Sequence, residues 1–138
     1  MKKILLVEDE PDFRFAVRMQ LEASGYDVIE AEDGVAGLDM ARKQSPDLII
    51  LDGMLPKLGG YDVVRLLKGD EEHRNIPILM LTARSQESDR QASMEVGADA
   101  HLTKPFDPEE LLKTIAGLLA SDCEDEGTRG EGELRSAE

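Results

Sequence analysis

The strongest constraint on the fold is an apolar run at residues 47–52, Asp-Leu-Ile-Ile-Leu-Asp, whose four central side chains are all large and aliphatic. A strand with one solvent-exposed face alternates apolar and polar side chains, whereas a strand covered on both faces does not. This run therefore predicts a strand over Asp47–Asp52 in the middle of a parallel sheet, with helices packed on both faces.

Similar short apolar runs recur along the chain and alternate with helical patterns. The runs predict further strands at Lys3–Val7, Asp27–Ala31, Ile76–Leu81 and Ala98–Thr103. Apolar side chains at helical spacing predict helices at Pro11–Ser24, Gly34–Gln44, Tyr61–Lys68, Ser85–Val96 and Pro108–Ala120, with Asp33 and Asp107 as N-caps of the second and last. Such alternation is typical of βα units, so the sequence predicts an α/β domain with a five-stranded parallel sheet.

The length of 138 residues leaves room for one domain, which we place at residues 1–120. Residues 121–138 hold seven acidic residues, three glycines and one large aliphatic side chain. Such a segment buries too little apolar surface to offset the entropy lost on folding. We therefore expect a disordered acidic tail from residue 121 onward.

Composition excludes several classes of protein. Thirty Asp and Glu against sixteen Lys and Arg give a formal net charge of −14, which repels nucleic acids and anionic membranes, so we expect neither as a direct partner. No apolar stretch has the roughly 18 residues of a membrane span, and the run after Lys2 and Lys3 is too short for a signal peptide. A single cysteine, Cys123, forbids an internal disulfide, and the chain is expected to be cytoplasmic.

Polar side chains follow the predicted strands where ligands bind in open parallel sheets, at the carboxyl ends. Glu8, Asp9 and Glu10 follow the first strand, Asp52 ends the third, Thr82 follows the fourth and Lys104 follows the fifth. Clustered carboxylates repel unless a cation is present, and Mg²⁺ prefers oxygen ligands of this kind. With Mg²⁺ bound, Asp52 can act as a nucleophile toward a phosphoryl group, whose oxygens Lys104 and Thr82 would bind.

Each of these residues also has an ordinary structural interpretation. The acidic triplet could favour a helix N-terminus, and Asp52 could be a turn residue before Gly53. Thr82 could cap a helix, and Lys104 could be a surface lysine. Their joint occurrence at four strand ends favours the phosphoryl acceptor site over the separate structural roles.

The same residues carry a resemblance to a known family. Residues 1 to about 120 resemble the receiver domain of two-component response regulators through VEDE at 7–10, LIILDGMLPKLGG at 48–60, MLTA at 80–83 and GADAHLTKPF at 97–106. The resemblance implies a doubly wound, flavodoxin-like sheet of order 2-1-3-4-5. It also implies that a sensor histidine kinase or a phosphotransfer protein phosphorylates Asp52.

The resemblance further implies the roles of individual residues. Mg²⁺, which Mn²⁺ can replace, would be held by Asp9, Asp52, the backbone carbonyl of Met54 and, often through water, Glu8. Thr82 and Lys104 would bind the phosphoryl group, and the peptide bond before Pro105 is expected to be cis.

The resemblance also implies an output surface on the fourth helix, fifth strand and fifth helix, reshaped by Thr82 and a strand-five aromatic, through which a downstream effector protein binds. Here His101 stands where the family usually has Tyr or Phe. His101 is either a half-exposed strand residue without a special role or a residue whose imidazole still acts as the switch. Met54 and Arg84 flank the route of the hydrolytic water, so we expect them to slow loss of the phosphoryl group. Ala100 replaces a commonly acidic dimer residue, and we expect a monomer or weak dimer.

Other functions remain open on sequence grounds. A haloacid dehalogenase-type hydrolase also uses an Asp after an apolar strand, but it needs a second Asp at the position of Met54. A flavin or dinucleotide module needs a glycine-rich phosphate loop, which does not follow the first strand. Within the receiver interpretation, the chain is either a stand-alone regulator or a fragment of a longer one. We expect a phosphoacceptor that phosphorylates and slowly dephosphorylates itself, not an enzyme acting on other substrates.

Overall fold

The computed structural model describes residues 2–52, 57–82, 97–104 and 106–127; for Thr82 and residues 121–127 it describes the backbone only. Five strands and four helices are found in these ranges. The strands are β1 (Lys3–Val7), β2 (Asp27–Ala31), β3 (Leu48–Asp52), β4 (Ile78–Thr82) and β5 (Ala100–Thr103), and the helices are α1 (Pro11–Ala23), α2 (Gly34–Gln44), α3 (Gly60–Lys68) and α5 (Pro108–Gly127).

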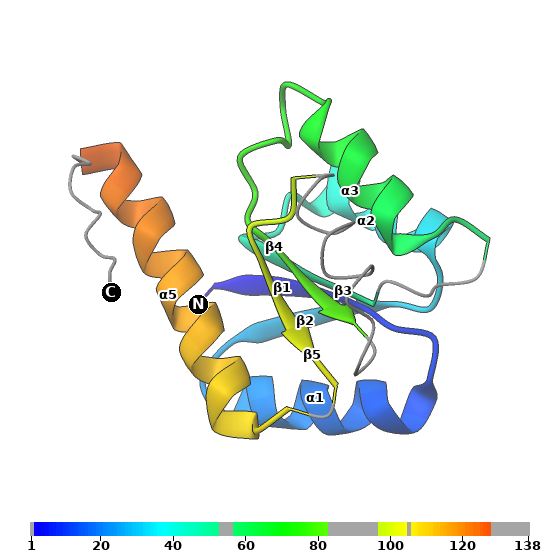
Figure 1. The fold of residues 1–138 in the computed structure, drawn as a ribbon, viewed down its shortest axis with the longest axis vertical. Coiled ribbons are helices and arrows are strands. Elements are labelled where there is room, and N and C mark those ends of the chain that lie inside the picture. The colour runs from blue at the N-terminus through cyan, green and yellow to red at the C-terminus, as the bar shows by residue number, and fades with distance from the viewer. Residues whose placement is uncertain (1, 53–56, 83–96, 105, 128–138) are drawn as a thin grey trace.

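The strands form one parallel sheet in the order β2-β1-β3-β4-β5. Figure 1 shows α1 and α5 on one side of this sheet and α2 and α3 on the other. The doubly wound α/β fold predicted above is therefore confirmed, including the strand order that the family resemblance implied.

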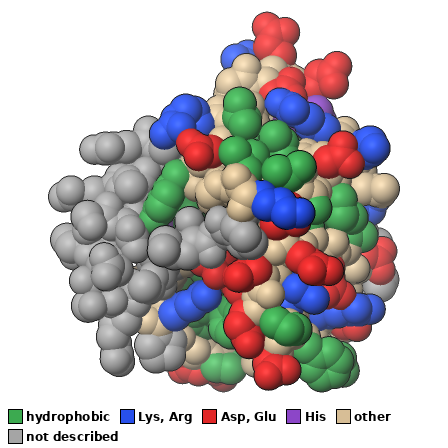
Figure 2. Space-filling view, turned by 90° about the vertical axis from the view of Figure 1, so that its right-hand side faces the viewer, with side chains coloured by type: hydrophobic (Ala, Val, Ile, Leu, Met, Phe, Trp, Pro, Cys, Tyr) green, Lys and Arg blue, Asp and Glu red, His purple; other side chains and the backbone are tan. Residues whose placement is uncertain are grey.

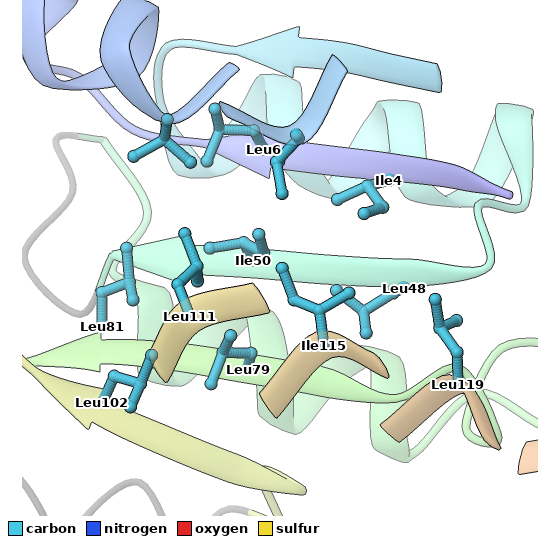
Figure 3. Packing of buried hydrophobic residues seen from close by; sticks show 12 residues of the cluster. Ile4, Leu6, Leu48, Ile50, Leu79, Leu81, Leu102, Leu111, Ile115 and Leu119 are labelled. Atoms are coloured by element: carbon cyan, nitrogen blue, oxygen red, sulfur yellow. The ribbon is translucent and has the colours of Figure 1, made fainter. Parts of the chain in front are cut away.

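Side chains of β3 point alternately into two hydrophobic layers, which is why its sequence is apolar throughout. Leu48 and Ile50 pack with α1 and α5, whereas Ile49 and Leu51 pack with α2 and α3. All four are fully buried. Figure 3 shows the first layer, in which Ile115 and other α5 side chains lie over the sheet. Because all the strand pairs are parallel, the carboxyl ends of the strands share one edge of the sheet.

Two N-terminal caps set where helices begin beside that edge. Asp33 caps α2 as predicted, because its carboxylate accepts a hydrogen bond of 2.8 Å from the backbone N–H of Ala36. Glu10 caps α1, accepting one of 2.8 Å from the N–H of Phe13. The acidic triplet had been predicted to favour a helix N-terminus through its charge, but the capping hydrogen bond of Glu10 had not.

Element boundaries differ from the predictions at several points. β3 begins at Leu48, β4 at Ile78 and β5 at Ala100, each one or two residues later than predicted. α5 continues to Gly127 instead of ending at Ala120, because residues 121–126 contain no glycine or proline that would stop a helix. The predicted domain limit at residue 120 and the predicted disordered tail stay predictions; beyond Gly127 the chain lies outside the described residues, as does the predicted helix Ser85–Val96.

Candidate acidic site at the carboxyl edge of the sheet

Three predicted site carboxylates meet where β1 and β3 end. Glu8 and Asp9 follow β1, and Asp52 is the last residue of β3. Each offers an oxygen atom, and these oxygens lie within 4.8 Å of one another. Glu8 is 1% exposed and Asp52 is 7% exposed, whereas Asp9 is open to solvent. Figure 2 views the molecule from the side toward which the strands run, where acidic and basic side chains lie next to each other.

Lys104, just after β5, brings a positive charge to these carboxylates. Its Nζ lies 3.1 Å from Oδ2 of Asp52 and 3.5 Å from Oε1 of Glu8. The same ammonium lies 4.6 Å from the centroid of the Phe13 ring, which in turn packs edge-on against Phe106. Lys104 is therefore held between two carboxylates and an aromatic face, a position that favours a cation.

The electrostatics of the site follow from burial. Burial raises the pKa of Glu8 from 4.5 to about 7; the negative charge of Asp52 adds to the rise, while the N–H of Glu10, 3.1 Å from Oε2, and the Lys104 ammonium oppose it. Burial alone lowers the pKa of Lys104, but the charges of Asp52 and Glu8 outweigh burial and raise this pKa above 10.5. The ammonium thus stays charged at neutral pH.

The donor set fits a hard divalent cation. The single ammonium of Lys104 does not neutralise the three carboxylates of the cluster, so a bound cation would reduce their mutual repulsion. Carboxylate oxygens are the ligands that Mg²⁺ takes in proteins, usually one or two together with water and phosphate oxygens. Glu8, Asp9 and Asp52 could hold such an ion while leaving Lys104 at the rim.

The other predicted site residues are described only in part. Thr82 ends β4 beside Thr103 in the register of β5, so its backbone lies at the same edge as Asp52. His101 is half-buried on β5, opposite Met80 of β4. Its position on β5 agrees with the prediction, and its role as a switch stays a prediction.

Three predicted site residues lie outside the part of the chain that the structure describes. They are Met54, Arg84 and Pro105. Their proposed roles therefore remain predictions.

Sequence reasoning missed Arg14, whose side chain lies directly behind the acidic site. Its Nη1 donates a hydrogen bond of 2.8 Å to the backbone carbonyl of Glu8, and its Nε donates one of 2.8 Å to Glu30 of β2. A sequence signal existed in Glu30, a carboxylate that follows the apolar residues Val28 and Ile29 within β2. The contact of the Phe13 ring with Lys104 likewise had no signal in the sequence.

The chain is similar in sequence to a known protein family. Residues 4–116 match the family model of the response regulator receiver domain. Over 119 residues the chain is 46% identical to the DNA-binding dual master transcriptional regulator RpaA of Synechocystis sp., covering 86% of this chain and 49% of RpaA. It is also 46% identical to the alkaline phosphatase synthesis transcriptional regulatory protein PhoP of Bacillus subtilis, covering 86% of this chain and 48% of PhoP. The chain spans about half the length of these relatives.

Solved structures show the same fold. The receiver domain of sensor histidine kinase PA1611 from Pseudomonas aeruginosa PAO1, with a magnesium ion coordinated in its active site cleft, matches with a TM-score of 0.82 and 34% identity, covering 87% of this chain and 98% of that one. Chemotaxis response regulator CheY4 of Vibrio cholerae matches with a TM-score of 0.80 and 37% identity, covering 86% of this chain and 98% of that one. In the described ranges, none of the helices has the length and apolar character needed to cross a bilayer.

Proposed function

The chain belongs to the response regulator receiver domain family, and from this premise we propose that Asp52 accepts a phosphoryl group from a sensor histidine kinase or a phosphotransfer protein. The observation that carries the proposal is the arrangement around Asp52. Its Oδ2 lies 3.1 Å from the Lys104 ammonium, and ligand oxygens of Glu8, Asp9 and Asp52 lie within 4.8 Å of one another. This combination places a nucleophile beside cationic and cation-binding groups.

The transfer is a displacement at phosphorus. A carboxylate oxygen of Asp52 forms a bond to phosphorus while the bond from phosphorus to the donor histidine nitrogen breaks. The nitrogen keeps the electron pair of that bond, and with a proton already on the other ring nitrogen of the phosphohistidine the leaving group is a neutral imidazole. Lys104, already 3.1 Å from Asp52, binds a phosphoryl oxygen and offsets its negative charge. The Thr82 hydroxyl is proposed to bind another oxygen.

Mg²⁺ is the proposed cofactor, with Mn²⁺ as a substitute. Asp9 and Asp52 would hold the ion together with the Met54 carbonyl, and Glu8 would hold it through water. When bound, the ion supplies positive charge next to the phosphoryl oxygens. The magnesium in the PA1611 receiver domain, which shares the fold at 34% identity, supports this choice of metal.

The output of the switch is proposed to be contact with an effector protein through the fourth helix, β5 and α5. Thr82 and His101 would couple this surface to the state of Asp52, while Met54 and Arg84 would shield the acyl phosphate from water. RpaA is described as a DNA-binding regulator, and this chain spans about half of it. The expected lack of direct nucleic acid contact therefore concerns residues 1–138 alone.

Membership of the receiver family also bears on the remaining alternatives. It supports a signalling switch over a haloacid dehalogenase-type hydrolase or a dinucleotide-binding module. Self-catalysed phosphorylation and slow dephosphorylation remain part of the proposal.

Incubation with a small phosphodonor and Mg²⁺ tests the proposal. Intact-mass spectrometry should detect one added phosphoryl group that hydroxylamine removes, as expected for an acyl phosphate. Asp52→Asn should prevent the addition, whereas Asp62→Asn, on the exposed surface of α3, should leave it unchanged. Equal labelling of Asp52→Asn and the wild type would reject Asp52 as the acceptor.

A further inference from the structure

Arg14 joins the acidic site to the edge strand of the sheet. It lies on α1, is 17% exposed, and donates hydrogen bonds of 2.8 Å to the backbone carbonyl of Glu8 and to the carboxylate of Glu30. These acceptors belong to different elements, the segment after β1 and strand β2. A guanidinium group can bridge them because its donors have a fixed, planar geometry.

The backbone of Glu8 is thereby fixed on both sides of the residue. Its N–H donates a hydrogen bond of 3.1 Å to the carbonyl of Ala31, at the end of β2, and its carbonyl accepts from Arg14. The Glu8 side chain is fixed as well, because Oε2 accepts from the N–H of Glu10 at 3.1 Å. The peptide that leads from Glu8 into Asp9 is therefore held before any ligand binds.

Glu30 holds Arg14 in place and is shared with a second arginine. Arg18, one turn further along α1, also forms an ion pair with Glu30 and another with Glu22 at 3.1 Å. Among the hydrogen bonds and ion pairs of the described residues, Arg14 contacts Glu8 and Arg18 does not. The two arginines thus share a carboxylate but differ in contact with the site.

From this geometry we propose that Arg14 is a positioning residue for cation binding, which sets the spacing between Asp9 and Asp52 by anchoring the Glu8 peptide to β2. The inference rests on the proposed function, since it assumes that these carboxylates hold Mg²⁺. A residue that hydrogen-bonds to the segment carrying the metal ligands holds those ligands in the orientation that binding requires. Its loss therefore weakens the affinity for the metal without removing a ligand. Arg14 touches neither the proposed ion nor the phosphoryl group.

Isothermal titration of metal-stripped protein with Mg²⁺ provides the test. Arg14→Lys keeps the positive charge but loses the planar guanidinium group that donates to both the Glu8 carbonyl and the Glu30 carboxylate. This variant should raise the Mg²⁺ dissociation constant about tenfold, the lower end of the effects seen when residues that orient metal ligands are changed. Glu30→Gln keeps an acceptor without its charge and should raise the constant about threefold, because neutral hydrogen bonds are roughly half as strong. Arg18→Lys is the matched control and should leave Mg²⁺ affinity unchanged.

A second readout separates positioning from general loss of structure. At saturating Mg²⁺ and small phosphodonor, the maximal phosphorylation rate of Arg14→Lys should equal that of the wild type, although half-saturation needs about ten times more Mg²⁺. The double variant Arg14→Lys, Glu30→Gln should bind no more weakly than Arg14→Lys alone, since Glu30 acts through Arg14. Circular dichroism and urea titration identify any variant that fails to fold, in which case Glu30→Gln alone decides.

The outcomes distinguish this inference from the function on which it rests. Wild-type protein that binds no Mg²⁺ would overturn the proposed function and the role of Arg14 with it. If the wild type binds Mg²⁺ and Arg14→Lys binds it with the same affinity, only the role of Arg14 is overturned. If Arg14→Lys does not fold, unchanged affinity in Glu30→Gln has the same consequence. Equal weakening in Arg14→Lys and Arg18→Lys would also overturn it, because the effect would then come from the charge network on α1 and not from the Glu8 carbonyl.

Discussion

Protonation of Glu8 should control the stability of the metal-free protein. The folded protein holds a proton on Glu8 more tightly than the unfolded chain does, because burial raises its pKa from 4.5 to about 7. For a carboxyl group with a raised pKa, the stabilising contribution is fully present below the unfolded pKa and is lost as pH rises through the folded one. Stability should therefore fall between about pH 4.5 and pH 8.

The size of this effect follows from the pKa and from solvent access. The rise in the Glu8 pKa from 4.5 to about 7 corresponds to about 3 kcal/mol, because each unit of pKa is equivalent to about 1.36 kcal/mol. Asp9 in the same cluster is open to solvent, and water that reaches the site weakens both the desolvation of Glu8 and its repulsion by Asp52, so we expect an effect of about 1–2 kcal/mol. Glu8→Gln cannot ionise, so it should remove this part of the pH dependence.

Urea unfolding followed by circular dichroism in EDTA, at about pH 5.5 and about pH 8.5, measures the difference. Wild-type protein should lose about 1–2 kcal/mol more than Glu8→Gln over this interval, whereas Glu71→Gln, on an exposed turn, should behave as wild type. The comparison cancels the titration of groups that do not interact with Glu8. Parallel pH profiles for wild type and Glu8→Gln would refute the reasoning.

Three further predictions concern the core, the glycines and the cation, and urea unfolding measures each. Ile115→Ala empties a fully buried position of α5 and should cost about 2–4 kcal/mol; a loss below 1 kcal/mol would contradict this packing. At Gly34, a Cβ would lie 1.7 Å from the carbonyl oxygen of Leu58, so Gly34→Ala should cost about 1–3 kcal/mol, whereas Gly117→Ala, with open space around it, should stabilise α5 by about 0.5–1 kcal/mol. The reverse ranking would count against the structure. Mg²⁺ at about 100 times its dissociation constant should stabilise the wild type by about 2.7 kcal/mol and have little effect on Asp9→Asn; equal stabilisation of both would exclude Asp9 as a ligand.

Much of the fold could be predicted because burial determines the sequence of its strands. Residues 48–51 are fully buried in two different layers, and an uninterrupted aliphatic run is the only pattern that satisfies both. The strand order was implied by the receiver resemblance and is confirmed. That order could not come from hydrophobic pattern alone, because the pattern tells which segments are strands but not which strands are neighbours.

Element ends were predicted less well, because hydrophobicity does not mark where strand pairing or a helix stops. Ile76 is apolar, yet it precedes β4, and its N–H bonds to the carbonyl of His73 in the preceding turn. The predicted end of the last helix at Ala120 rested on the acidic residues that follow, whereas the backbone remains helical to Gly127; residues 121–126 contain no glycine or proline, so no strong helix breaker marks an end there.

The clustering of the predicted site carboxylates could be anticipated from the sequence, whereas the contacts that hold them in place could not. Glu8, Asp9, Asp52 and Lys104 follow strand ends, and a parallel sheet brings such positions to one edge. The bond from Arg14 to the Glu8 carbonyl joins a helix to a backbone group. Backbone carbonyls carry no residue-specific signal in a sequence, so contacts of this kind become visible only when the tertiary arrangement is known.

The central claim is that Asp52 is the phosphoryl acceptor of a Mg²⁺-dependent switch. The most direct measurement is reduction of the phosphorylated protein with borohydride, which converts an aspartyl phosphate to homoserine, followed by mass-spectrometric mapping of the peptides. With Mg²⁺ and a small phosphodonor, homoserine should appear at position 52 alone, and EDTA should abolish it. Homoserine at another aspartate, or undiminished labelling of Asp52 in EDTA, would contradict the account.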